Sequence, residues 1–153
     1  MFHIVLVQPE IPYNTGNIAR TCAVAGAKLH LIRPLGFDIS EPAVKRAGLD
    51  YWDKVFVDAF DDFESFLTAY PEASCFCVET VGSRRYDRVS YPENAFFVFG
   101  RETKGLPQEV IDRFPDQLIR IPMRPGLRSL NLSNAAAIVL FEALRQHDFM
   151  GLA

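Results

Sequence analysis

RIPMRPGLRSLNLSNAAAIVLFEALR, residues 120–145, is the stretch that decides the fold of this chain. A short hydrophobic strand at 118–121 enters a loop rich in Pro, Gly and Arg, which leads directly into a helix with seven consecutive apolar residues, 135–141. Backbone groups left unpaired at a strand end and a helix start can bind a small polar ligand, and Arg124 and Arg128 add positive charge beside them. This stretch alone leaves two interpretations open, a ligand-binding loop or a tight strand-to-helix connection with solvated arginines.

Apolar runs of strand length alternate with helical segments over the rest of the chain. We expect strands at residues 3–8, 29–32, 55–57, 74–79, 96–99 and 118–121. We expect helices at residues 15–25, 41–47, 61–70, 108–113 and about 132–148. Gly26 fits the glycine that ends a helix, and Asp61 and Asp62 fit a helix N-cap. Continuous apolar strands separated by helices predict an α/β fold, a mostly parallel sheet covered by helices on both faces.

Length and composition indicate one globular domain, residues 1–153, with a single core, because 49% of the residues are hydrophobic. No apolar run approaches the roughly 20 residues of a membrane span. The N-terminus lacks the pattern of a signal peptide, so we expect a cytoplasmic protein. The three cysteines are expected to be reduced core residues. We expect no metal site, because the three histidines lie far from the cysteines and from one another in sequence.

The formal net charge of −3 argues against a generic nucleic-acid coat, which would be basic overall. Acidic residues gather at 58–64, whereas the arginines form two groups, Arg84, Arg85 and Arg88, and Arg120, Arg124 and Arg128. These groups are either a local patch that holds an RNA stem or scattered solubilising charges. The polar stretch 82–94 follows a predicted strand, so it either faces the substrate at the carboxyl edge of the sheet or is an exposed loop.

Three segments, in order, carry a family resemblance: NTGNIART (14–21), FVFGRETKGLP (97–107) and IPMRPGLRSLNLSNAAA (121–137). They resemble the three signature motifs of the SPOUT methyltransferases, the trefoil-knotted class that uses S-adenosylmethionine. Within that class the chain is similar over its whole length to the short tRNA 2'-O-methyltransferases of the TrmL/YibK type, of which RAGLDYWDKV (46–55) is also typical. The resemblance implies 2'-O-methylation of the wobble nucleotide, cytidine or uridine, in the anticodon stem-loop of tRNA.

The resemblance also implies a C-terminal trefoil knot, in which the last segment passes through a loop formed earlier. Threading of this kind would build the cofactor pocket from the turns after Glu79, Phe99 and Ile121. General rules of chain connection argue against knots, so this expectation depends on the resemblance alone.

Cofactor contacts follow from the same resemblance. Backbone groups near Ile121, Met123 and Leu130 would hold the adenine, and Thr80 and Gly100 would lie by the ribose and the methionine portion. A glycine at position 100 is physically reasonable, because a side chain there would obstruct a close approach of backbone to ligand.

Catalysis would centre on Arg20 in the first motif, since the matching arginine of related enzymes lies at the reacting hydroxyl. A guanidinium, with a pKa above about 12, is a poor general base. We therefore expect Arg20 to grip a phosphate or to stabilise the developing alkoxide, with the proton lost to water or to a phosphate oxygen. Ser129 and Asn131 would bond the cofactor carboxylate or the target ribose.

Glu102, in the second motif, would pair with Arg20 or orient Asn14. The simpler alternatives are a surface ion pair of Glu102 with Arg101 or Lys104, and capping of the first helix by the asparagines of the first motif, Asn14 and Asn17.

Two further features have alternative explanations. Tyr51 and Trp52 either stack on RNA bases or pack in the core or an interface, and the second is favoured because Trp is usually largely buried. The apolar residues 135–141 cover every direction around a helix, which indicates a homodimer or a helix enclosed within the monomer.

Two other functions remain to be weighed against a methyltransferase. One is a non-catalytic protein that binds RNA or S-adenosylmethionine. The other is a nucleotide-binding enzyme in which GRETKG forms a phosphate loop, although Leu106 and Pro107 stand where that loop needs Lys and Ser or Thr.

Overall fold

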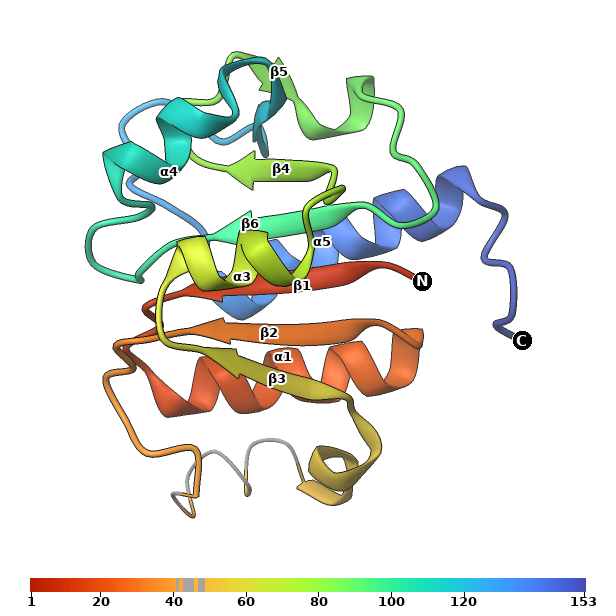
Figure 1. Ribbon diagram of the computed structural model, residues 1–153. Helices are drawn as coiled ribbons and strands as arrows, with labels where there is room; N and C mark the ends of the chain where they lie inside the picture. Colours follow the sequence, from red (N-terminus) through yellow and green to blue (C-terminus); the bar gives the residue numbers. More distant parts are fainter. Residues whose placement is uncertain (41, 43–45, 47–48) are drawn as a thin grey trace.

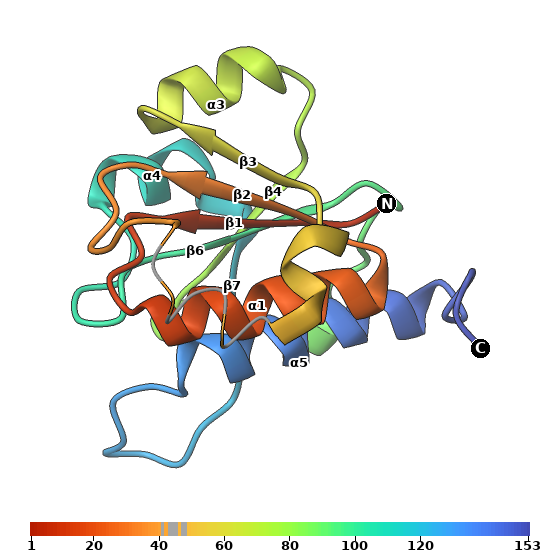
Figure 2. The same ribbon diagram turned by 90° about the horizontal axis from the view of Figure 1, so that it is seen from below.

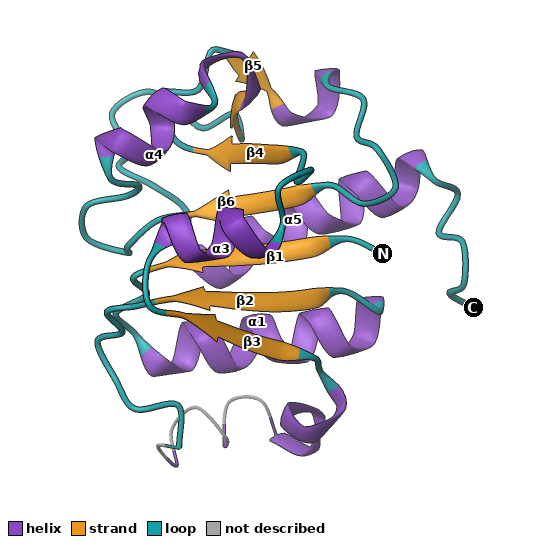
Figure 3. Cartoon of the chain, viewed as in Figure 1, coloured by secondary structure: helices purple, strands orange, loops and turns teal. Residues whose placement is uncertain are grey.

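The computed structural model describes residues 1–40, 42, 46 and 49–153. Within them the chain forms a seven-stranded parallel sheet with the strand order β3-β2-β1-β6-β4-β7-β5 (Figures 1 and 3). The strands are β1 His3–Val7, β2 Lys28–Ile32, β3 Val57–Phe60, β4 Cys75–Val78, β5 Arg84–Arg85, β6 Phe96–Phe99 and β7 Leu118–Arg120.

Helices cover both faces of the sheet, as predicted. The described helices are α1 Pro12–Ala25, α3 Phe63–Ala69, α4 Gln108–Arg113 and α5 Leu132–Gln146, with short 3-10 turns η1 Leu49–Lys54, η2 Tyr86–Arg88 and η3 Pro115–Gln117. Helices α1 and α5 lie side by side on one face, and α3 and α4 lie on the other (Figure 2). The helix expected at 41–47 falls on residues most of which lie outside the described part.

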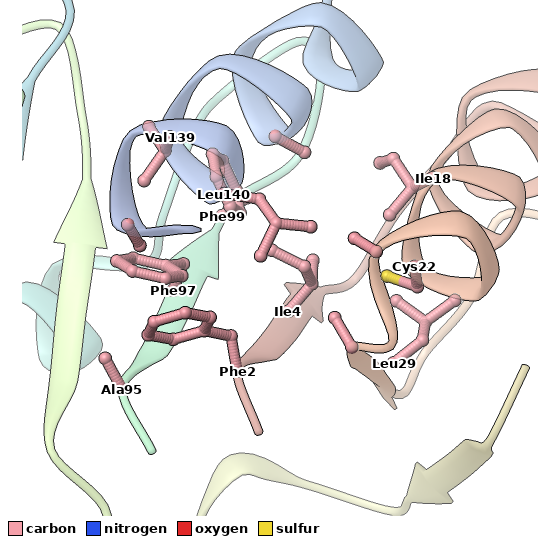
Figure 4. Packing of buried hydrophobic residues seen from close by; sticks show 14 of the residues in the cluster. Phe2, Ile4, Ile18, Cys22, Leu29, Ala95, Phe97, Phe99, Val139 and Leu140 are labelled. Atoms are coloured by element: carbon pink, nitrogen blue, oxygen red, sulfur yellow. The ribbon is translucent and has the colours of Figure 1, made fainter. Parts of the chain in front are cut away.

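Alternating side chains of the central strands supply the two halves of the core. Phe97 lies beside Phe2 under α5, and Ile4 of β1 lies between it and the α1 residues Ile18 and Cys22 of the same cluster (Figure 4). The next residues along the strands belong to the second cluster, under α3 and α4. Because successive residues of a strand point to opposite faces, continuous apolar runs are what a strand covered on both sides requires.

The position of β7 agrees with the knot that the resemblance implies. It lies between β4 and β5, so the short segment that joins those two strands, residues 79–83, has to cross it. At the crossing, a Cβ added to Gly82 would lie 2.4 Å from the carbonyl carbon of Ile119. Strand β7 therefore lies directly against an earlier connection of the chain, and the turns after β4, β6 and β7 meet at one edge.

Local signals for the helix ends are confirmed. Gly26 ends α1 in the left-handed conformation with a φ of 66°, and the Asp62 carboxylate accepts a hydrogen bond from the Ser65 backbone N–H at the start of α3. Helix α1 begins at Pro12, three residues before the expected Thr15. Proline suits the first turn of a helix because its missing N–H has no partner there.

One strand was predicted at the wrong position, and another was not predicted. The strand expected at 55–57 lies at Val57–Phe60, where Asp58 interrupts the apolar pattern and pairs with Lys28 on the neighbouring strand at 3.2 Å. The polar stretch 82–94 contains the strand Arg84–Arg85, whose side chains are exposed and which is defined only by its pairing with β7.

The cysteines and Trp52 pack as expected. All three cysteines are free and buried, and burial raises the pKa of each thiol to about 12. Trp52 is half-buried and packs against the core cluster under α1. In the part of the chain that the structure describes, no helix is long and apolar enough to span a bilayer.

Candidate functional site

A cavity of about 430 Å³ opens at the carboxyl edge of the sheet, toward which the strand arrows point in Figure 1. This volume lies in the range of small-molecule sites. The turns after β4, β6 and β7 build its walls, together with the first turns of α1 and α5. All six residues expected to contact the cofactor line it: Thr80, Gly100, Ile121, Met123, Ser129 and Leu130.

A hydrogen-bonded chain of three side chains ties the three motifs together at this cavity. Asn14 is buried in the first turn of α1, and its Nδ2 donates to Glu102 Oε1 at 3.3 Å. Its Oδ1 accepts from Asn131 Nδ2 at 3.1 Å. One buried amide thus links the loop after β6 to the loop after β7, which fixes the two walls relative to each other.

Glu102 also holds the start of α1. Its carboxylate accepts the backbone N–H of Glu10 at 2.9 Å and of Ile11 at 3.1 Å. The predicted link to Asn14 is therefore present. Neither an ion pair of Glu102 with Arg101 or Lys104 nor one with Arg20 is formed among the described residues.

The capping alternative for the first motif is wrong. Helix α1 begins at Pro12, so Asn14 and Asn17 lie inside the helix, Asn14 buried and Asn17 exposed. The asparagine that does cap a helix is Asn131, whose Oδ1 accepts the backbone N–H groups of Ser133 at 2.9 Å and Asn134 at 3.3 Å.

The loop after β6 folds back on itself. Arg101 and Gly105 exchange backbone hydrogen bonds of 3.1 and 2.8 Å. A Cβ at Gly100 would lie 2.0 Å from the carbonyl carbon of Gly105, so glycine is required there by this tight turn, and not only by a ligand. Because two of its N–H groups bond within the turn, the loop does not offer the open cradle of a phosphate loop.

Glu79 is a cavity residue that the sequence reasoning missed. Its carboxylate accepts the backbone N–H of Leu106 and lies against Gly105, so it clamps the turn after β6 to the end of β4. Burial raises the pKa of Glu79, although its hydrogen bonds to backbone N–H groups act the other way. The available signal was an acidic residue directly after an apolar strand.

Arg20 lies outside the cavity lining, on the exposed side of α1. Its guanidinium carbon lies 5.2 Å from the ring centroid of Tyr51 in η1, a cation–π contact. The structure therefore does not bring Arg20 together with the other predicted catalytic residues within one protomer.

Three basic side chains line the cavity, together with the carboxylates of Glu79 and Glu102. Arg101, Lys104 and Arg128 line it, and within the described ranges none of them forms an ion pair with a carboxylate. Searching the same ranges for three His, Cys, Asp or Glu side chains placed to hold a metal ion finds no such group. A polyanion such as RNA is the kind of partner that this rim favours.

The cavity fits S-adenosylmethionine. Its walls include Val78, Phe99 and Ile121, an apolar surface suited to an adenine ring. From residue 122 to residue 130 one backbone–backbone hydrogen bond is formed in the described structure, Leu127 N–H to Arg124 C=O at 3.5 Å. The remaining backbone donors and acceptors of this loop are available to the polar edge of a ligand.

Known proteins resemble this chain in sequence and in fold. Residues 1–141 match the SpoU rRNA Methylase family. A tRNA (cytidine(34)-2'-O)-methyltransferase from Methylovorus glucosotrophus is 50% identical, and the match covers 99% of each protein.

Solved structures of related proteins have the same fold as this chain. A structure that gives insights into the 2-OH methylation of C/U34 on tRNA is 46% identical with a TM-score of 0.93, over 97% of each chain. An AdoMet-bound rRNA methyltransferase from Sinorhizobium meliloti is 28% identical with a TM-score of 0.86, over 94% of this chain and 56% of that chain. With a family match over most of its length and relatives of this identity, the chain belongs to the SpoU rRNA methylase family.

Proposed function

We propose that the protein transfers a methyl group from S-adenosylmethionine to the 2'-hydroxyl of the wobble nucleotide, cytidine or uridine 34, of tRNA. The observation that carries the proposal is the meeting of three motif loops at one cavity, joined through the Glu102, Asn14 and Asn131 side chains. A relative that is 50% identical over its full length is named a tRNA (cytidine(34)-2'-O)-methyltransferase.

S-adenosylmethionine, when bound, supplies an electrophilic methyl group on a sulfonium. Free backbone groups near Ile121, Met123 and Leu130 would hold its adenine, and Thr80 and Gly100 would border its ribose and methionine portion. Ser129 would bond its carboxylate or the target ribose. The Asn131 amide is already bound to Asn14 and to the start of α5, so its main task is to position this wall.

The protein's own contribution is alignment and electrostatics. Holding the two reactants in line contributes roughly 7–11 kcal/mol in well-oriented systems, and a cavity with fixed walls suits that task. Arg20 would bind an RNA phosphate or stabilise the developing alkoxide, and the proton would leave to water or to a phosphate oxygen. Because Arg20 lies outside its own cavity, it would act on RNA that reaches across α1 or at the cavity of a partner.

A homodimer formed through the outer face of α1 and α5 would allow Arg20 of one subunit to act at the cavity of the other. Tyr13 (51% exposed) and Val24 (53%) on α1 and Phe141 (40%) on α5 leave apolar surface uncovered there. Arg20 is exposed on α1 between Tyr13 and Val24, one turn from Val24. We expect sedimentation at micromolar concentration to give a dimer, and a monomer would remove this part of the proposal.

The proposal is tested in cells that lack the gene. Mass spectrometry of their tRNA should show loss of 2'-O-methylation at position 34, and the wild-type gene should restore it. An Arg20→Ala gene should not restore it, although the variant protein should still bind S-adenosylhomocysteine. Unchanged methylation of position 34 in the deletion strain would overturn the proposal. A substrate of this kind also implies a cytoplasmic location.

A further inference from the structure

A second cleft, of about 640 Å³, lies apart from the cavity, between the β5–η2 segment and the segment from the end of α4 to η3. Figure 1 shows β5 and α4 together at the upper edge of the sheet. Three arginines line the cleft, Arg84, Arg88 and Arg113, together with Ser90. Nothing in the proposed reaction at the first cavity uses these residues.

The arginines of this cleft differ in how far their charge is already neutralised. Arg113 is paired with Glu64 at 2.5 Å. Arg88 lies 3.8 Å from Asp87, a carboxylate that Arg85 already binds through two hydrogen bonds of 3.0 and 2.8 Å.

Arg84 bonds only a carbonyl oxygen, that of Asp116 at 3.4 Å, and forms no ion pair within the described chain. Asp116 also lines the cleft, so it is the acidic group that faces these arginines there. The guanidinium groups of Arg84 and Arg88 thus remain open to an anion, and a guanidinium fits phosphate oxygens through paired N–H groups.

The cleft is connected to the cavity along β7. Gln117 lines the cleft and Ile121 lines the cavity, so four residues of extended chain, about 13 Å, separate the two sites. Arg85 and Arg120, which are register partners on β5 and β7, lie along the same path. A polynucleotide that places one ribose at the cavity has other backbone phosphates within this reach.

We propose that this cleft binds a backbone phosphate of the substrate RNA, away from the nucleotide that is methylated, through Arg84 and Arg88. The inference rests on the proposed function, because it assigns a second contact to the same RNA. The Ser90 hydroxyl would add a hydrogen bond to the phosphate.

The test measures binding of a fluorescent anticodon stem-loop to the full protein, saturated with S-adenosylhomocysteine, between 50 and 200 mM salt. Arg84→Ala/Arg88→Ala should raise the Kd about tenfold and reduce the slope of log Kd against log salt by about 1. Arg84→Lys/Arg88→Lys keeps both charges and should retain the wild-type slope. Arg33→Ala is the matched control, since it removes an exposed arginine that pairs with Asp61 away from the cleft.

Each result decides a separate point. An alanine double variant with the wild-type Kd and slope overturns the inference and leaves the proposed function intact. A lysine double variant whose salt slope falls as far as that of the alanine variant shows a structural effect, which also overturns the phosphate contact. Wild-type protein that binds the cofactor product but no stem-loop overturns the proposed function, and this inference with it.

Discussion

Asn14 is the most tightly specified side chain of the cavity, because its two amide atoms meet partners of opposite kind. The NH2 group donates to a carboxylate and the oxygen accepts from a second amide, and the residue is almost completely buried. An amide is the simplest side chain that offers a donor and an acceptor in this way.

Asn14→Asp should therefore be severe. It replaces the donor by a second carboxylate beside Glu102 in a buried site, and leaving a charged group unpaired costs more than the roughly 1–3 kcal/mol of a neutral one. We expect the free energy of unfolding in urea to fall by at least that amount, together with methyl transfer. Asn17→Asp is the control, three residues further along α1 and exposed, and it should change neither quantity. Equal effects of the two substitutions would contradict the buried network.

Gly100→Ala tests the fold of the turn after β6. The new Cβ would collide with the Gly105 backbone, and strain of this kind typically costs 1–3 kcal/mol, so the wall has to move. We expect weaker binding of S-adenosylhomocysteine in calorimetry. Gly26→Ala, at a positive φ with open space around it, should cost about 1 kcal/mol of stability without changing that affinity. Wild-type affinity in Gly100→Ala would show that the turn does not shape the pocket.

At the scale of elements, helix starts and loop clamps position the site. Glu102 ties the start of α1 to the turn after β6, and Asn131 caps α5 while bonding Asn14. Both helices therefore begin at the cavity wall, and a displacement of either one would change the shape of the cavity.

The contact of Glu79 with the turn after β6 can be tested by substitution. Glu79→Ala removes the acceptor for the Leu106 N–H, whereas Glu79→Gln keeps a carbonyl oxygen in its place. Loss of one such hydrogen bond should raise the Kd for S-adenosylhomocysteine about tenfold in the alanine variant, about 1.4 kcal/mol, and less in the glutamine variant. Glu72→Ala, an exposed acidic residue before β4, is the control. If Glu79→Ala bound the cofactor product as tightly as Glu72→Ala, the clamp would have no role.

Sequence patterns were sufficient for elements that are buried on both sides and failed where pairing or charge defines the element. The strand Phe96–Phe99 was predicted with its observed bounds because four large apolar residues lie between two small ones, Ala95 and Gly100. Arg84–Arg85 is a strand only because β7 lies beside it, and local sequence does not contain that information. Glu79 was missed for a related reason, since its partner Leu106 is distant in sequence.

At the scale of the whole molecule, two stacked histidines make stability depend on pH. His3 Nδ1 lies 2.9 Å from His30 Nε2, and burial lowers the pKa of His3 to about 4 and of His30 to about 3. In the unfolded chain both would bind protons near the ordinary value of 6.5, so the unfolded state is favoured as the pH falls below that value.

The free energy of unfolding in urea should therefore decrease between pH 7 and pH 4.5. His30→Gln removes one of the two groups and should reduce the dependence, and His147→Gln, which keeps the pair of His3 and His30, is the control variant. If the free energy of unfolding were constant over this interval, the imidazoles of His3 and His30 would not be held neutral in the folded protein.

The central claim is that the three joined loops direct methyl transfer to one ribose hydroxyl. The most direct measurement is transfer of labelled methyl from S-adenosylmethionine to two synthetic anticodon stem-loops, identical except that one has a 2'-deoxyribose at position 34. We predict stoichiometric labelling of the ribose form and none of the deoxy form, with equal binding of both. Equal labelling of the two would contradict the claim.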